Sequence, residues 1–267
     1  MNARCITNKI PDLSILVADV CPDLILITET WLHSDIPDVQ LSLPGYCIFR
    51  KDRKSDNDRH GGVLIAAKFN LNPRNVCTET DIEVAFINLI INGTKIKVGV
   101  AYRPPSLNAT MSHNFINVIR DQMNNSDKFM IFGDFNFPGI DWRTRSHSSN
   151  IERYFLDILD ELNCTQFVNE PTTEYSSLLD LCIGSSSEIV SDLQVHESFS
   201  TSDHFYCTCL IDIPKTSVSS ELIIKDFRNV DWNLVRTHLS LIDWDQLFFN
   251  RTVEEMWFIF KNTINNL

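Results

Sequence analysis

The sequence predicts an α/β protein in which helices lie against mixed, partly antiparallel sheets. Short apolar runs of strand length alternate with stretches in which apolar residues recur at helical spacing. Two of the apolar runs are separated by Asn92 and Gly93, and an Asn-Gly pair between such runs is typical of a β-hairpin. Other runs are separated by helical stretches, as in strand-helix-strand units. Hairpins and crossovers are therefore both expected.

The helical and extended patterns follow one another in order up to residue 213. Apolar side chains at helical spacing predict helices at 8–20, 112–123 and 151–163. Apolar runs bounded by polar or turn residues predict the strands. These runs cover residues 23–31, 46–51, 61–68, 83–91, 95–103, 129–133, 177–184, 188–197 and 203–213.

The chain is predicted to contain one large domain, a linker and a helical tail. All the predicted strands lie in residues 1–213. The pattern breaks at PKTSVSS, and we place the linker at residues 214–225. Residues 226–267 consist of helical segments that are rich in Trp and Phe and carry no polar cluster that suggests chemistry. We therefore expect the tail to be an appendage.

Composition excludes some classes of function. The net charge of -12 gives no general electrostatic attraction to nucleic acid, so DNA binding would depend on local features. No apolar run approaches the roughly 18 residues of a membrane span, and we expect no membrane partner. The eight cysteines include no C-x-x-C pair. We expect reduced thiols and an intracellular location, nuclear or cytoplasmic.

Polar side chains recur at the ends of the predicted strands. Each one alone is explained at least as well by a cap, a turn or a hydrogen-bonded core position. A buried carboxylate without a partner is costly, however, and a sandwich that gathers its strand ends at one edge would bring these side chains together. The residues are Glu29, Tyr102, Asp134, Asn136, Asp180, Asp203 and His204.

Such a cluster is suited to metal-assisted hydrolysis of a phosphate ester. Glu29 and a second carboxylate can hold a hard divalent cation through oxygen atoms, as Mg²⁺ prefers. The cation would neutralise charge that develops on a phosphoryl group. Asp134 can take a proton from water, while Asn136 orients that carboxylate or the phosphate. His204 beside Asp203 resembles a histidine that a carboxylate orients and makes more basic.

An ordered set of short motifs resembles the endonuclease/exonuclease/phosphatase superfamily. The motif sequences are most similar to those of the apurinic-type endonuclease domain of non-LTR retrotransposons, and the resemblance covers about residues 2–213. The set is specific, whereas SDH or YRPP alone would be weak. The motifs are NAR (2–4), TETWL (28–32), YRPP (102–105), GDFN (133–136), LLDLCI (178–183) and SDH (202–204).

The resemblance implies a four-layer α/β sandwich of two mixed, mostly antiparallel sheets flanked by helices. It implies a phosphodiesterase that depends on Mg²⁺, with Mn²⁺ as the alternative ion, and that nicks DNA to leave a 3′-hydroxyl for reverse transcription. In this family the NAR motif ends an apolar first strand. We therefore expect that strand to be truncated, with Asn2 on a frayed terminus. The tail resembles the segment before a reverse transcriptase and is expected to pack on that missing domain.

The resemblance also implies ligands for the metal. Glu29 would be a ligand, with Asn2 nearby. Asp203 would either approach the metal or pair with His204. The motifs do not decide between one metal ion and two.

The remaining motif residues would act on the phosphate and the water. Asp134 would activate or align the nucleophilic water, supported by Asn136. Tyr102 would contact the scissile phosphate. Asp180 would orient His204 or shape the site, and His204 would stabilise the pentacoordinate phosphate.

Three hypotheses about function follow. The first is a DNA endonuclease, which the TETWL and YRPP motifs favour. The second is a superfamily phosphatase that acts on another phosphate ester, such as a phosphoinositide or a nucleotide. The third is an inactive, truncated relic that binds nucleic acid weakly. The absent first strand motivates this third hypothesis.

Overall fold

The computed structural model describes residues 1–41, 43–54, 60–76, 81–126, 128–213 and 231–265. The chain separates into two compact units, Met1–Ser217 and Val218–Leu267. The linker predicted at 214–225 lies outside the described residues.

The described residues of the first unit form eleven strands. Each of the predicted extended runs contains a strand, and two short strands, β4 and β8, had no sequence signal. The strands are β1 Leu24–Thr28, β2 Tyr46–Lys51, β3 Val63–Lys68, β4 Arg74–Val76, β5 Val84–Ile91, β6 Thr94–Tyr102, β7 Phe129–Asp134, β8 Thr165–Gln166, β9 Asp180–Gly184, β10 Val190–Ser198 and β11 Phe205–Ile211.

Backbone hydrogen bonds join these strands into three sheets. The largest has the order β4-β5-β6-β7-β9-β8, and a smaller one has the order β1-β3-β2. The third is the antiparallel pair β10-β11. Among the described strands, β6 and β7 form the one parallel pair of a sheet, because α2 crosses over between them. Asn92 and Gly93 both have positive φ, 53° and 80°, as a two-residue turn between β5 and β6 requires.

Helices cover the outer faces of the sheets. The α-helices of the first unit are α1 Ile10–Val20, α2 Ala109–Asn124 and α3 Asn150–Glu161, and the 3₁₀ helices are η1 Thr7–Lys9, η2 Asp38–Leu41 and η3 Phe69–Leu71. The helix predicted at 8–20 thus begins as a 3₁₀ turn. Asn108 caps α2, and Ser149 caps α3 by accepting from the backbone N–H of Glu152.

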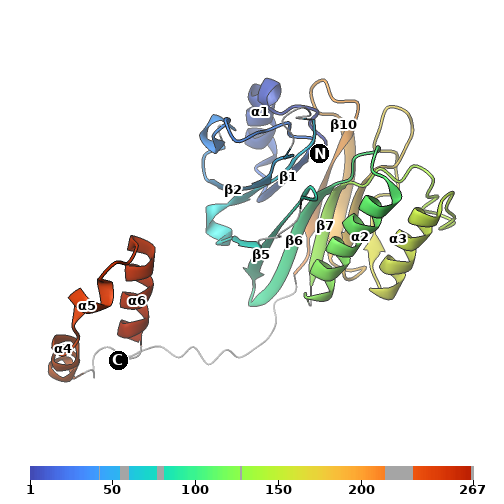
Figure 1. The fold of residues 1–267 in the computed structure, drawn as a ribbon. Helices are drawn as coiled ribbons and strands as arrows, with labels where there is room; N and C mark the ends of the chain where they lie inside the picture. Colours follow the sequence, from blue (N-terminus) through green and yellow to red (C-terminus); the bar gives the residue numbers. More distant parts are fainter. Residues whose placement is uncertain (42, 55–59, 77–80, 127, 214–230, 266–267) are drawn as a thin grey trace. The chain divides into compact units, whose positions relative to one another are not determined.

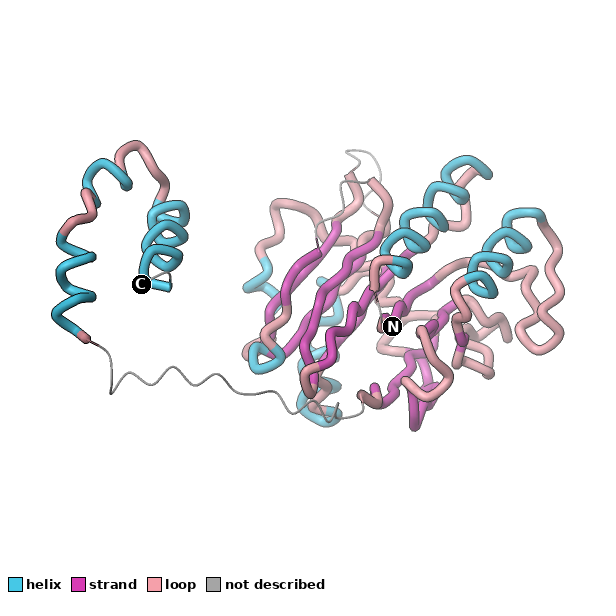
Figure 2. The backbone as a smooth tube through the Cα atoms, turned by 90° about the horizontal axis from the view of Figure 1, so that it is seen from below, coloured by secondary structure: helices cyan, strands magenta, loops and turns pink. Residues whose placement is uncertain are grey.

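Three hydrophobic clusters hold four layers together. Leu13 of α1 packs with Ile27 and Leu64 on the outer face of the three-stranded sheet. Apolar residues from all three sheets pack in the centre, including Ile65 and Val98. On the far side of the six-stranded sheet, α2 and α3 lie side by side over a third cluster that includes Phe115. Figures 1 and 2 show this layering, which confirms the predicted four-layer α/β sandwich. The described strands form three hydrogen-bonded sheets rather than the predicted two, because no strand pairing joins β10-β11 to β1-β3-β2.

The N-terminal residues differ from the frayed terminus that the sequence predicted. Asn2 is fully buried and forms an isolated parallel bridge with Thr28. The terminal amino group donates to the carbonyl of Leu26, and Thr28 N–H donates to the carbonyl of Met1. On the other side, the Ser202 hydroxyl donates to the Asn2 carbonyl. A short extended segment thus joins the edge of β1 to the start of β11.

The second unit contains three helices within its described residues. They are α4 Trp232–Ser240, α5 Trp244–Phe248 and α6 Val253–Asn265. Trp244 contacts the rings of Phe248 and Phe260, whereas Trp257 remains 63% exposed. In the part of the chain that the structure describes, no helix has the length and apolar character of a membrane span.

Candidate active site

Strand register places three polar side chains next to one another in the six-stranded sheet. Tyr102 on β6 pairs with Asp134 on β7, and Asp134 pairs in turn with Asp180 on β9. Each residue stands at the end of its strand where that edge meets the smaller sheets. Glu29 follows β1 directly, and His204 precedes β11. The site is therefore built from strand ends of all three sheets.

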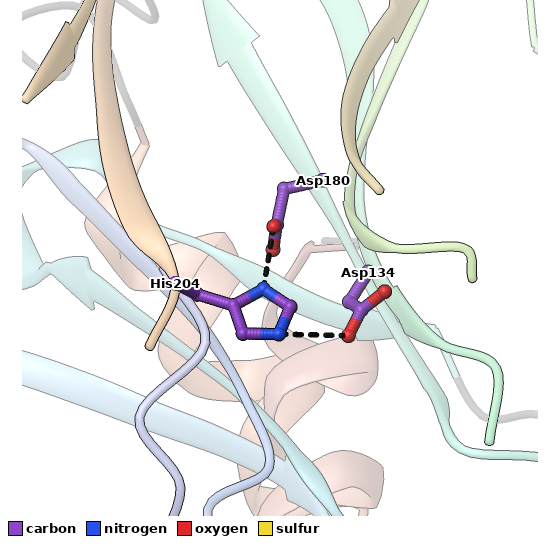
Figure 3. Close-up of side chains that lie close together, drawn as sticks. All are labelled: Asp134, Asp180 and His204. Atoms are coloured by element: carbon purple, nitrogen blue, oxygen red, sulfur yellow. Dashed lines mark hydrogen bonds and ion pairs between the residues drawn. The ribbon is translucent and has the colours of Figure 1, made fainter. Parts of the chain in front are cut away.

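Asp134, Asp180 and His204 form a chain of close contacts, shown in Figure 3. His204 Nδ1 lies 2.7 Å from Asp180 Oδ2, and His204 Nε2 lies 3.9 Å from Asp134 Oδ2. Burial disfavours the imidazolium, but the hydrogen bond to Asp180 and the charges of the nearby carboxylates outweigh burial. They raise the pKa of His204 to about 9. The imidazole therefore carries a positive charge at neutral pH.

Asp134 is 1% exposed and lies at the centre of the cluster. Burial and the charge of Asp180 raise the pKa of the Asp134 carboxyl well above its usual range. The carboxylate accepts from Asn2 Nδ2 at 3.1 Å and from the backbone N–H of Asn136, also at 3.1 Å. These donors orient Asp134 from two sides, and the hydrogen bond from Asn2 offsets part of the rise in its pKa.

Glu29 is held by donors at both of its oxygens. Asn2 Nδ2 donates to Glu29 Oε1 at 3.0 Å, and the indole N–H of Trp31 donates to Oε2 at 3.2 Å. Burial of Tyr102 and the nearby charges of Glu29 and Asp134 raise the pKa of its phenol. Glu29 and Trp31 both have positive φ, so this turn is a strained one that its surroundings must fix.

Asp203 lies beside His204 but is paired elsewhere. Its Oδ2 lies 2.7 Å from Arg4 Nη1, and its Oδ1 is 4.0 Å from His204 Nε2. Within the described residues, the buried Oδ1 has no hydrogen-bond partner. Ser202 joins this edge to the rest of the site, because its hydroxyl accepts from His204 N–H and donates to the Asn2 carbonyl.

Comparison with known proteins gives matches in family and in fold. Residues 96–208 match the protein family described as endonuclease-reverse transcriptase. The endonuclease domain of TRAS1, a telomere-specific non-LTR retrotransposon, superposes with a TM-score of 0.59 at 16% identity, covering 80% of this chain and 96% of that one. The likeness to this structure shows a shared fold.

Other solved structures share this fold. The AP endonuclease of Leishmania major gives a TM-score of 0.62 at 16% identity, covering 79% of this chain and 86% of that one. The 3′ phosphatase NExo from Neisseria, bound to product DNA hairpin, gives 0.59 at 18% identity, covering 79% and 97%. No curated protein gives a significant sequence match.

The fold brings all the predicted site residues into one network, with one difference in orientation. The Asn136 side chain turns away from Asp134 and donates to the backbone carbonyl of Arg103 at 2.9 Å. Asn136 reaches Asp134 through its backbone N–H instead. Arg103 completes the loop, because its Nη1 donates to the Asn136 carbonyl at 3.0 Å. We had expected the amide itself to contact the carboxylate or the phosphate.

Three residues of the network were missed by sequence reasoning. Trp31, Arg103 and Ser202 all stand inside the motifs TETWL, YRPP and SDH. Their place in those motifs is the signal that was available. Their contacts depend on tertiary structure. Arg103 binds Asn136 and Ser202 binds Asn2, which are remote in sequence. Trp31 binds Glu29 within a turn.

The carboxylates fit a divalent cation. In the described part of the chain, the grouping of Asp134, Asp180 and His204 could hold an ion. His204 already joins these two carboxylates by hydrogen bonding and attraction, and Glu29 offers a further carboxylate beside them. Asp203 Oδ1, which has no hydrogen-bond partner within the described residues, is another oxygen of the kind that Mg²⁺ takes. Asn2 presents its N–H₂ group to the carboxylates, so it could be a ligand only if the amide turned over.

Proposed function

We propose that this domain is a Mg²⁺-dependent phosphodiesterase that nicks DNA, with Mn²⁺ as the alternative ion. The observation that supports it best is the buried chain of Asp180, His204 and Asp134, which lies beside the Glu29 carboxylate. Asn2 connects the two parts by donating to both Glu29 and Asp134. A proton acceptor, a cationic donor and a cation site thus meet at one sheet edge.

The chain's own residues divide the work of hydrolysis. Asp134 takes a proton from water as the water oxygen bonds to phosphorus, and its raised pKa suits it to accept that proton. The charged His204 imidazole stabilises the pentacoordinate phosphate, with Asp180 holding the ring. Tyr102 donates to a phosphate oxygen. Glu29 would hold a divalent cation, which would supply neutralisation of the charge that develops on the phosphate. The P–O3′ bond then breaks, the phosphate stays on the 5′ side, and the O3′ oxygen takes a proton from solvent to become a 3′-hydroxyl.

The DNA substrate and the retrotransposon origin are parts of the same proposal. They are supported by the family description, endonuclease-reverse transcriptase, and by the TRAS1 and NExo structures, whose names refer to a retrotransposon and to a DNA hairpin. In this reading the 3′-hydroxyl primes reverse transcription. The helical tail packs on a reverse transcriptase domain, which would cover its exposed Trp257.

The test is nicking of supercoiled plasmid by the purified chain, with Mg²⁺ and with EDTA. Asp134→Asn and His204→Ala are expected to abolish nicking. The matched control is Asp157→Asn, which removes a carboxylate that is 63% exposed on α3. Nicking that survives in EDTA, or in either site variant, would refute the proposal. A folded chain that does not nick would support the inactive relic instead.

A phosphatase is the second candidate. It is favoured by the likeness to NExo, which is named a 3′ phosphatase. A duplex with a nick that ends in a 3′-phosphate separates the two functions. Phosphate release without cleavage of intact plasmid would favour the phosphatase.

A further inference from the structure

Arg4 lies at the exposed rim of the site, next to the residues that form its centre. Its guanidinium contacts Asp203 Oδ2 at 2.7 Å, and its backbone N–H donates to Asn2 Oδ1 at 3.2 Å. The Arg4 side chain is 49% exposed, whereas His204 is 11% exposed. Arg4 therefore reaches solvent from a position that the buried network fixes.

The backbone around Arg4 is strained and held in place. Arg4 and Cys5 both have positive φ, 40° and 77°, which is unusual for two consecutive residues with side chains. Cys5 N–H donates to the Glu29 carbonyl at 3.0 Å, and Lys9 Nζ donates to the Ala3 carbonyl at 2.6 Å. Such strain persists only where surrounding contacts impose it, and it is concentrated at functional sites.

The negative charge of the site would oppose the binding of DNA, and Arg4 is placed to offset it. The carboxylates of Glu29, Asp134, Asp180 and Asp203 all lie in or beside the network, in a chain of net charge -12. This charge repels a DNA backbone, and His204 is too buried to meet a phosphate that lies outside the centre. Arg4 uses Nη1 on Asp203, and among the described residues its other side-chain N–H groups have no partner, so they can bind phosphate oxygens in the forked geometry that Arg favours.

We propose that Arg4 binds a phosphate of the DNA strand beside the scissile one, with Asp203 aiming its guanidinium. This inference rests on the proposed function, because it takes DNA as the substrate. In this proposal Asp203 Oδ2 accepts a hydrogen bond from Arg4, and Asp203 Oδ1 stays available to the cation. Because phosphate contacts carry no sequence information, the contribution of Arg4 is the same on every DNA sequence.

The test is the salt dependence of DNA binding, measured by fluorescence anisotropy on a labelled duplex in EDTA, where the proposed cleavage does not occur. Each phosphate contact contributes about 0.9 to the slope of log affinity against log salt. We expect Arg4→Ala to reduce that slope by about 0.9 and to weaken binding about tenfold or more at low salt. Arg4→Lys should keep the slope while losing part of the affinity, since it keeps the charge but not the fork.

The matched control is Arg153→Ala on α3, which removes an exposed arginine from the other face of the six-stranded sheet. Its slope is expected to equal that of the wild type. If Arg4→Ala binds with the wild-type slope but nicks more slowly, Arg4 only positions Asp203 and the inference is wrong. Circular dichroism identifies a variant that has not folded, and Arg4→Gln then replaces it with the same expected loss. A wild type that binds DNA without nicking would refute the proposed function alone, whereas one that does not bind DNA would refute both.

Discussion

Raising the pH should destabilise the metal-free protein through His204. The folded-state pKa of His204 is about 9, against an ordinary value of 6.5. Because the folded state holds the proton more tightly, the stabilisation is fully present below pH 6.5 and is lost as the pH rises through about 9. EDTA keeps the carboxylates free of metal, so that they hold the imidazolium as described here.

The contacts of His204 give the size of this effect. A pKa difference converts at about 1.36 kcal/mol per pH unit, so the rise from 6.5 to about 9 amounts to about 3 kcal/mol. The side chain is 11% exposed, and its charged partners Asp180 and Asp134 lie at 2.7 and 3.9 Å. Solvent therefore screens these interactions little.

The assay is urea unfolding in EDTA at a series of pH values from 6 to about 9.5. We expect the wild type to lose about 3 kcal/mol more over this range than His204→Gln, which cannot titrate. His147→Gln is the control, because it removes an exposed imidazole outside the site and should follow the wild type. Equal pH dependence in the wild type and His204→Gln would refute the charge assignment.

Three further predictions test the packing and the support of the site. Gly133→Ala should cost more than about 3 kcal/mol in urea unfolding, because at φ +140° the new Cβ would collide with the Ala101 carbonyl; a neutral result would contradict this geometry. Phe135→Ala should lower the free energy of unfolding by about 3–5 kcal/mol, since the ring is fully buried. A loss below about 1 kcal/mol would contradict this and show that neighbouring side chains fill the cavity. Trp31→Phe keeps the ring but removes the donor to Glu29, and should raise the Mg²⁺ concentration needed for nicking about 10–100-fold. An unchanged Mg²⁺ requirement would separate Trp31 from the cation site.

Much of the fold could be predicted because local signals agree with tertiary structure. The Asn92-Gly93 turn, the amphipathic α3 and the apolar runs each specify one local conformation. Strand ends were less certain. The run 23–31 predicted a strand through Glu29, but β1 ends at Thr28 because Glu29 adopts positive φ. The short strands β4 and β8 exist through pairing with longer neighbours, which is a tertiary effect.

The composition of the site could be predicted, but its internal contacts could not. Motifs show which residues occur together, not which atoms meet. Asn136 illustrates this, because its positive φ brings its backbone N–H to Asp134 while its amide turns to Arg103. Asn2 was expected to fray because its motif stands at the start of the sequence. Three-dimensional contacts with Glu29, Asp134 and Ser202 bury it instead.

Those contacts make Asn2 the residue on which the whole arrangement depends. Its side chain donates to Glu29 and Asp134, which come from different sheets, and its carbonyl accepts from Ser202 beside His204. Without these donors, the Glu29 and Asp134 carboxylates would each lose a hydrogen bond, and their mutual repulsion would be less offset. A buried charge that loses its partners is strongly destabilising, so the contacts that form the site also stabilise the packing of the sheets. Asn2 thus brings the carboxylates together through its side chain, while its backbone carbonyl joins the segment beside β1 to Ser202 near the start of β11.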